Sequence, residues 1–123
     1  GIRVALVTNK QRSLTVEFLQ SRGLESLFDT VVAGDDCSNN KPAPDMLIRA
    51  MTEMNVCASE TVMVGDSRND ALAGRAAGVS VALVETGYNE GVSIADWARE
   101  AGFTRVYPSA RKVCERIVAS GRL

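Results

Sequence analysis

The stretch Val62-Met63-Val64-Gly65-Asp66-Ser67-Arg68-Asn69-Asp70 decides the fold of this chain. A short apolar run ends at a glycine, and two carboxylates follow it. An apolar run bounded by such a turn is typical of a buried strand, and open α/β sheets bind their ligands at the edge where strands of this kind end. Two hard oxygen ligands at that edge suit Mg²⁺, so Asp66 and Asp70 are candidate metal ligands.

The same stretch also fits the start of a helix. Ser67 followed three residues later by Asp70 resembles a capping box in which Asp replaces Glu. Acidic residues in a first helical turn also interact favourably with the helix dipole. Taken alone, the stretch is compatible with a metal site, with a helix cap, or with both.

Length and composition indicate one globular domain. The chain has 123 residues, of which 46% are hydrophobic and 24% charged, and its formal net charge is -1. We expect residues 1–123 to form a single core domain. There is no basic run interleaved with aromatic residues and no apolar stretch of about 20 residues, so we expect neither a nucleic-acid partner nor a membrane partner.

The residues available for chemistry are limited. The sequence contains no histidine, and its three cysteines, Cys37, Cys57 and Cys114, form no CxxC pair. Neither a zinc site nor a disulfide framework is indicated, and we expect reduced thiols in a cytoplasmic protein. Catalysis would therefore depend on carboxylates, lysines, hydroxyls, thiols or backbone amides.

Strands and helices alternate along the chain, which predicts βαβ units and a mostly parallel sheet. Ser13 is the expected cap of the first helix, and Leu14, Phe18 and Leu19 its expected inner face. The apolar residues after that helix, from Leu24 to Phe28, are expected to continue the core. The predicted strands cover 4–7, 30–33, 61–64, 79–84 and 104–107. The predicted helices cover 13–22, 44–55, the segment from the acidic turn to Gly78, and 93–101. A last helix is predicted to begin after Ser109, which could cap it, and to run through Val113, Ile117 and Val118.

Three polar clusters each follow a strand and should meet at one edge of a parallel sheet. They are Thr8-Asn9, Lys41 and the acidic pair Asp66 and Asp70. Together they supply a hydroxyl, backbone amides, an ammonium group and two carboxylates. Phosphoryl transfer needs this set, because donors bind the phosphate oxygens, a cation offsets developing charge, and carboxylates hold Mg²⁺. Each residue also has a simpler role, since Thr8 could end a strand, Asn9 could form a turn and Lys41 could be a solvated surface charge.

These motifs resemble the haloacid dehalogenase superfamily, in particular its phosphoglycolate phosphatase-like branch. The segments are Val4-Ala5-Leu6-Val7-Thr8-Asn9-Lys10, Lys41-Pro42-Ala43-Pro44-Asp45, the acidic stretch, and Gly87-Tyr88-Asn89 with Gly91. The resemblance implies a Rossmann-like three-layer αβα fold and a Mg²⁺-dependent phosphatase acting on a small phosphorylated metabolite such as 2-phosphoglycolate. It also implies phosphate binding by Thr8, Asn9 and Lys41, a catalytic role for Lys41 and Thr8, and metal binding by Asp66 and Asp70.

One family motif is missing from the sequence. The family's first motif is an Asp-x-Asp on a central first strand, and it supplies the aspartyl nucleophile; no Asp-x-Asp occurs here. The pair Asp35-Asp36 has a different spacing and follows another strand. The resemblance therefore implies a partial core that lacks the first strand and the helical cap domain. We expect little phosphatase activity from this chain alone, because covalent catalysis needs a nucleophile.

Two other interpretations remain at the level of sequence. The chain could be a non-catalytic module of the same fold that binds a partner, either a second copy or a polypeptide that completes the sheet, because a missing central strand exposes two strand edges. A receiver-like domain phosphorylated on Asp66 is a weaker alternative, because it would need an acidic pair on an earlier strand, and no such pair is present.

Overall fold

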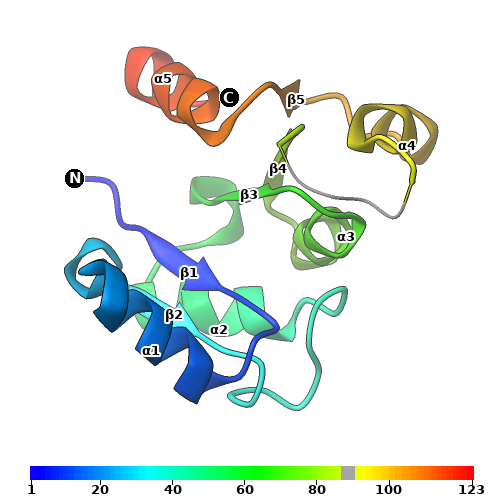
Figure 1. Cartoon of the computed structure of the whole chain (residues 1–123). Coiled ribbons are helices and arrows are strands. Elements are labelled where there is room, and N and C mark those ends of the chain that lie inside the picture. Colours follow the sequence, from blue (N-terminus) through cyan, green and yellow to red (C-terminus); the bar gives the residue numbers. More distant parts are fainter. Residues whose placement is uncertain (87–90) are drawn as a thin grey trace.

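The computed structural model describes residues 1–86 and 91–123 as an α/β domain of strands alternating with helices (Figure 1). In chain order the elements are β1 (Ala5–Val7), α1 (Arg12–Arg22), the 3-10 turn η1 (Glu25–Leu27), β2 (Thr30–Val32), α2 (Asp45–Met54), the 3-10 turn η2 (Ala58–Glu60), β3 (Val62–Gly65), α3 (Arg68–Ala77), β4 (Ser80–Val84), α4 (Ile94–Ala101), β5 (Val106–Tyr107) and α5 (Ala110–Ser120).

The strands form two parallel sheets instead of one. β1 pairs with β2, with Leu6 opposite Val31, and β3, β4 and β5 form a second sheet in that order, with Val64 opposite Ala82. Within the described residues no ladder joins β1 to β3. β1 and β3 therefore lie in separate sheets.

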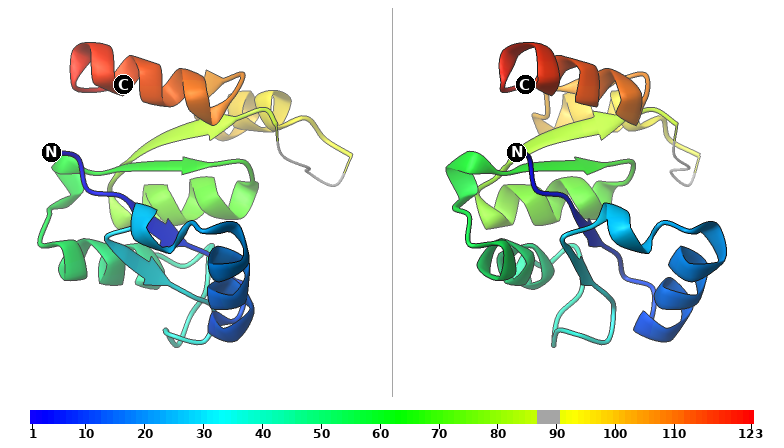
Figure 2. Two further views of the ribbon diagram at one scale, coloured as in Figure 1. Left: turned by 60° about the vertical axis from the view of Figure 1, so that its left-hand side comes forward. Right: turned by 90° about the vertical axis from the view of Figure 1, so that its left-hand side faces the viewer.

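Helices cover both faces of each sheet, which confirms the predicted three layers. Figure 2 shows α1 and α2 on opposite sides of the β1–β2 pair. In the second sheet, Leu83 packs with Ala71 of α3 and Ala98 of α4, whereas Ala82 and Val84 of the same strand pack with Val113 of α5. A strand buried on both faces is typical of parallel sheets, and it explains why β4 is apolar almost throughout.

Helices α2 and α3 connect the two sheets through one hydrophobic cluster. Leu47 and Met51 of α2 pack with Ala73 of α3, and Val7 of β1 and Met63 of β3 both join this cluster. Met46 of α2 is fully buried in a neighbouring cluster. The apolar face of α2 therefore contributes to two clusters of the core.

The first helix differs from its prediction. α1 starts at Arg12 with Gln11 as N-cap, so Ser13 is not the cap. Leu14 and Phe18 are 52% and 45% exposed, and the buried residues of α1 are Thr15 and Leu19. Arg12, Thr15 and Leu19 share one helical face at spacings of three and four, and Arg12 on that face bonds to Val31 O of β2 and to Asp36 in the loop after it.

Other helix ends match their predictions more closely. The Ser93 and Ser109 hydroxyls, at the predicted starts of the last two helices, accept hydrogen bonds from the N–H groups of Asp96 (3.1 Å) and Lys112 (3.3 Å), so both serines are N-caps. Leu27 was expected in the core but is exposed. The predicted loop residues Gly87, Tyr88 and Asn89 lie outside the described residues. Over the described ranges, none of the helices is long and apolar enough to cross a membrane.

Candidate functional site

The loop after β1 is a tight turn that carries Thr8 and Asn9. The Thr8 N–H donates to Val32 O (3.0 Å), which extends the parallel ladder by one bond. The Thr8 hydroxyl accepts the N–H of Lys10 (3.2 Å), the hydrogen bond of a serine/threonine turn. A hydroxyl that accepts one bond in this way still has its own proton to donate to an anion.

Asn9 joins this loop to the loop that carries Lys41. Its side-chain Nδ2 donates to Lys41 O (3.0 Å), and its Oδ1 accepts the N–H of Lys41 (3.1 Å). Both polar atoms of the side chain thus hold the Lys41 backbone, at a residue whose peptide bond to Pro42 is cis. The backbone N–H of Asn9 makes no hydrogen bond within residues 1–86 and 91–123. The backbone is therefore the part of Asn9 that can donate to a phosphate.

The Lys41 ammonium lies between the two sheets. Its Nζ donates to Val7 O of β1 (3.0 Å) and to Asp70 Oδ1 of α3 (2.6 Å). The side chains of Lys41 and Asp70 are only 10% and 11% exposed. Lys41 is therefore a nearly buried cation at the carboxyl end of β1, and not the solvated surface charge of the simpler interpretation.

The acidic turn combines a helix cap with a buried carboxylate. Ser67 is the N-cap of α3, and its hydroxyl accepts the N–H of Asp70 (3.3 Å). The other oxygen of Asp70, Oδ2, accepts the N–H of Asp66 (3.2 Å). A Cβ atom on Gly65 would lie 2.3 Å from the Cβ of Asp70, so only glycine allows the helix to approach the strand this closely. The capping prediction is confirmed for Ser67.

The two carboxylates are suitable but incomplete as a metal site. Asp66 is exposed at the end of β3, whereas both oxygens of Asp70 already accept hydrogen bonds. The described part of the chain contains no cluster of three or more acidic, cysteine or histidine side chains that could hold a metal ion. Mg²⁺ is commonly held by one or two carboxylates together with waters and a substrate phosphate, and the donor set here fits that pattern.

Comparison with known proteins identifies the family. Residues 1–84 match the family model described as haloacid dehalogenase-like hydrolase. The chain belongs to the haloacid dehalogenase-like hydrolase family. Its relatives include a phosphoglycolate phosphatase of Nitrosospira multiformis, which is 37% identical over 113 residues and matches 92% of this chain and 50% of that protein.

A differently named relative and a solved structure are also similar to this chain. The pyrophosphatase PpaX of Halalkalibacterium halodurans is 43% identical over 84 residues, which are 68% of this chain and 39% of that protein. The crystal structure of a predicted phosphoglycolate phosphatase from Haemophilus somnus superimposes with a TM-score of 0.83 at 25% identity, covering 94% of this chain and 49% of that one. The chain spans about half the length of the relatives it matches.

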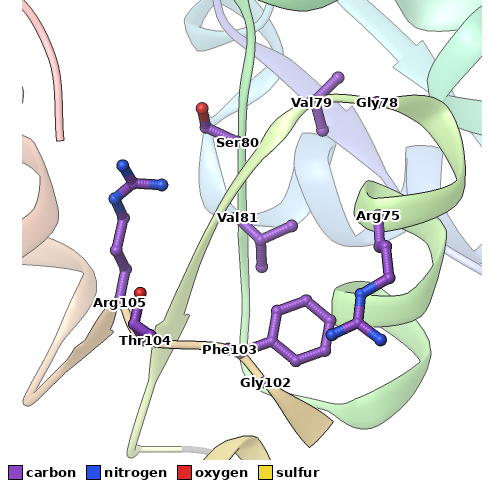
Figure 3. Close-up of a pocket in the computed structure, with 9 residues that line it drawn as sticks. All are labelled: Arg75, Gly78, Val79, Ser80, Val81, Gly102, Phe103, Thr104 and Arg105. Atoms are coloured by element: carbon purple, nitrogen blue, oxygen red, sulfur yellow. The ribbon is translucent and has the colours of Figure 1, made fainter.

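A pocket of about 380 Å³ lies away from the loops of the candidate site (Figure 3). Ser80 in its lining pairs with Val62 at the amino end of β3, whereas the candidate site follows the carboxyl end of that strand. Arg75 donates to Ala101 O and stacks on the Phe103 ring, 3.9 Å from its centroid. Arg75 thus offsets the partial negative charge at the end of α4, which gives this lining residue a structural role.

Sequence reasoning missed the part played by Asp35 and Asp36, which it set aside as unsuitable for a nucleophile. Asp36 binds the guanidinium of Arg12, and that hydrogen bond lowers the pKa of Asp36 to about 2. The only available signal was that both acids follow β2, at the same sheet edge as the other polar loops. No local pattern pairs them with Arg12, which lies 24 positions away from Asp36.

Proposed function

We propose that this chain provides the phosphate-binding and metal-binding loops of a Mg²⁺-dependent phosphomonoester hydrolase. One observation carries the proposal: Lys41 holds Asp70 through its ammonium group and Asn9 through its backbone. Three segments that are distant in sequence are thereby joined where the carboxyl end of β1 meets the first turn of α3. A buried cation beside carboxylates and exposed donors suits the binding of a phosphate monoester dianion.

Each residue has a distinct proposed role. The Thr8 hydroxyl and the Asn9 backbone N–H bind phosphate oxygens, and Lys41 offsets their charge as it accumulates in the transition state. Asp66 and Asp70 hold the metal, Asp66 directly and Asp70 directly or through water, with Asp70 also fixing the Lys41 ammonium. When bound, Mg²⁺ would supply further positive charge to the phosphate oxygens.

We propose 2-phosphoglycolate as substrate because relatives of this chain carry the name phosphoglycolate phosphatase. Inorganic pyrophosphate is the second candidate, since a pyrophosphatase is also among the relatives. The 123 residues contain no Asp-x-Asp, so this chain alone is expected to give no turnover with either compound. Turnover on the order of 1 s⁻¹ by the pure chain with Mg²⁺ would contradict this expectation.

Binding of the metal tests the proposal without requiring turnover. Calorimetric titration with Mg²⁺ in the presence of inorganic phosphate should give a weaker affinity for Asp66→Asn than for the parent chain. Asp96→Asn is the matched control, because Asp96 is also an exposed acid next to a helix N-terminus but lies on α4. Equal Mg²⁺ affinities of the parent chain and Asp66→Asn would contradict metal binding by Asp66 and leave it a structural role.

A non-catalytic interaction module is the second candidate function, and the separate sheets favour it. β1 and β3 each present an edge with no strand partner among the described residues, and such edges readily pair with another chain. A partner strand, or a second copy of the chain, would then occupy the space between them. Sedimentation analysis at increasing concentration tests self-association, and a monomer at all concentrations would exclude the second copy.

A further inference from the structure

Two neighbouring carboxylates after β2 hold the first residue of α1. The backbone N–H of Arg12 donates to Asp35 Oδ1 (2.8 Å), so Asp35 takes the place of a side-chain cap that Gln11 does not provide. The guanidinium of Arg12 donates from Nε to Asp36 Oδ1 (2.8 Å), and its terminal nitrogen also reaches Asp36 Oδ2. This two-pronged geometry is the strong form of an arginine–carboxylate pair.

The same pair is anchored in β2. A terminal nitrogen of Arg12 donates to Val31 O (2.7 Å), and Asp36 Oδ2 accepts the N–H of Ala33 (2.8 Å). Asp36 is 12% exposed at its side chain, whereas Arg12 is 43% exposed. The carboxylate is therefore the inner member of the pair, and it ties the start of α1 to the end of β2.

This arrangement fixes both ends of the segment that carries Thr8 and Asn9. At its start, Thr8 continues the ladder with β2, and at its end Arg12 is held by the two carboxylates. Between them, the N–H of Gly34 donates to Lys10 O (2.7 Å). A Cβ atom on Gly34 would lie 2.0 Å from Asn9 O, so the loop after β2 rests directly against the Asn9 backbone.

We propose that Arg12 and Asp36 are positioning residues for the phosphate-binding loop at Thr8 and Asn9. Neither residue would touch the substrate; they act by holding the loop in one conformation before the anion arrives. A loop that is ordered in advance loses less conformational entropy on binding, which favours affinity. The effect on phosphate binding rests on the proposed function. The effect on the order of the loop does not, and it can be measured separately.

We call the pair Arg12–Asp36 the clamp. The first measurement is amide hydrogen exchange at Gly34, whose N–H bonds to Lys10 O next to this clamp. Asp36→Asn keeps the shape of the side chain but removes its charge, and it should raise the Gly34 exchange rate at least about tenfold, in line with loss of a charge-assisted hydrogen bond. Arg12→Gln removes the same contacts from the exposed side and should also raise the Gly34 exchange rate. It replaces Asp36→Asn in the experiment if that variant folds poorly.

Val113→Ala is the matched control for a general loss of stability. Val113 of α5 is fully buried against β4, so its truncation destabilises the fold without touching the loop at Thr8 and Asn9. It should leave the Gly34 exchange rate near that of the parent chain under conditions where both remain folded. Equal Gly34 exchange in the parent chain, Asp36→Asn and Arg12→Gln would overturn the clamp.

The second measurement is binding of inorganic phosphate in the presence of Mg²⁺, followed by the amide shifts of Thr8, Asn9 and Lys10. Asp36→Asn should weaken binding several-fold, and Val113→Ala should not. Arg12→Lys keeps the charge but not the two-pronged geometry, so its affinity should be intermediate. A parent chain without phosphate affinity would overturn the proposed function, and the exchange comparison would then decide on the clamp alone. If Asp36→Asn showed faster Gly34 exchange but unchanged phosphate affinity, the role of Asp36 in positioning the phosphate-binding loop would be overturned.

Discussion

The ammonium of Lys41 lies 2.6 Å from Asp70 Oδ1, and this pair links the loop before α2 to the first turn of α3. The same ammonium group also binds Val7 O at the end of β1. One side chain therefore connects β1 of the first sheet to α3, the helix that follows β3 of the second sheet. Such a nearly buried pair makes the site and the stability of the fold depend on the same atoms.

Removing the cation should be costly to the fold. Lys41→Met keeps much of the side-chain volume but leaves the Asp70 carboxylate nearly buried without its partner. We expect the free energy of unfolding to fall by about 3–5 kcal/mol, the usual result of breaking a buried pair on one side. Urea denaturation measures this change.

The double variant Lys41→Met/Asp70→Asn distinguishes an unpaired charge from simple loss of packing. It should be more stable than Lys41→Met alone, because the neutral amide oxygen can still accept the N–H of Asp66. Lys112→Met is the control, since the exposed pair of Lys112 with Glu115 should contribute less than about 1 kcal/mol. A similar loss in both lysine variants would contradict the role given to Lys41.

Acid should weaken the clamp between Arg12 and Asp36. The hydrogen bond from Arg12 is the main cause that lowers the pKa of Asp36 from 3.8 to about 2, while burial opposes it. The folded state thus binds this proton less readily than the unfolded state, so the contribution is complete above pH 3.8 and is lost as the pH falls towards 2. We expect a loss of about 1–2 kcal/mol from this group, reduced by the solvent exposure of Arg12.

Unfolding by urea at pH 6 and at pH 2.5 checks this expectation against Asp36→Asn. The variant has no carboxyl group to protonate at that position, so its stability should fall less over the same interval. Other acids titrate equally in both proteins, which makes the difference between them specific to Asp36. An identical decline in the two proteins would show that Asp36 has an ordinary pKa.

Gly34→Ala should disrupt the fold through lack of space. The added Cβ would lie 2.0 Å from the backbone oxygen of Asn9, and a backbone atom cannot move aside as a side chain can. We expect a loss of more than about 3 kcal/mol, at the high end for single substitutions. Thermal unfolding and the amide shifts of Asn9 and Lys10 would detect both the loss and the displaced loop.

Gly78→Ala is the comparison that separates space from backbone conformation. Gly78 ends α3 at a φ of 76°, but the nearest atom to an added Cβ is 4.0 Å away. Alanine there should cost only about 1–2 kcal/mol, the penalty of the left-handed conformation. If the two alanine variants lost equal stability, close approach to Asn9 would not explain the glycine at position 34.

Two neighbouring apolar residues on α1 should differ sharply in their importance. Leu19 is 4% exposed and Phe18 is 45% exposed. We expect Leu19→Ala to lower the free energy of unfolding by about 2–5 kcal/mol, as for other buried leucines. Phe18→Ala should cost less than about 1.5 kcal/mol, mainly the contacts of its ring with the cations of Lys10 and Arg22. Urea denaturation that ranks Phe18 above Leu19 would contradict the observed orientation of α1.

The sequence by itself determined the order and type of the elements. Continuous apolar runs such as Val79 to Val84 mark strands buried on both faces, and serine caps such as Ser67 and Ser109 mark helix starts, because both signals are local. The polar residues after each strand also follow from sequence, since parallel strands bring their carboxyl ends to one edge.

Tertiary structure alone decided how those elements and side chains meet. The helical pattern of Leu14 and Phe18 suggested an inner face, but in the structure Thr15 and Leu19 of α1 face inward, and Arg12 of the same helix bonds to Asp36. No local pattern reveals that bond, nor the pairing of Lys41 with Asp70, because the partners lie 24 and 29 positions apart. Hydrophobic burial sets which surfaces meet without regard to sequence distance, and only then do the charged groups come within reach.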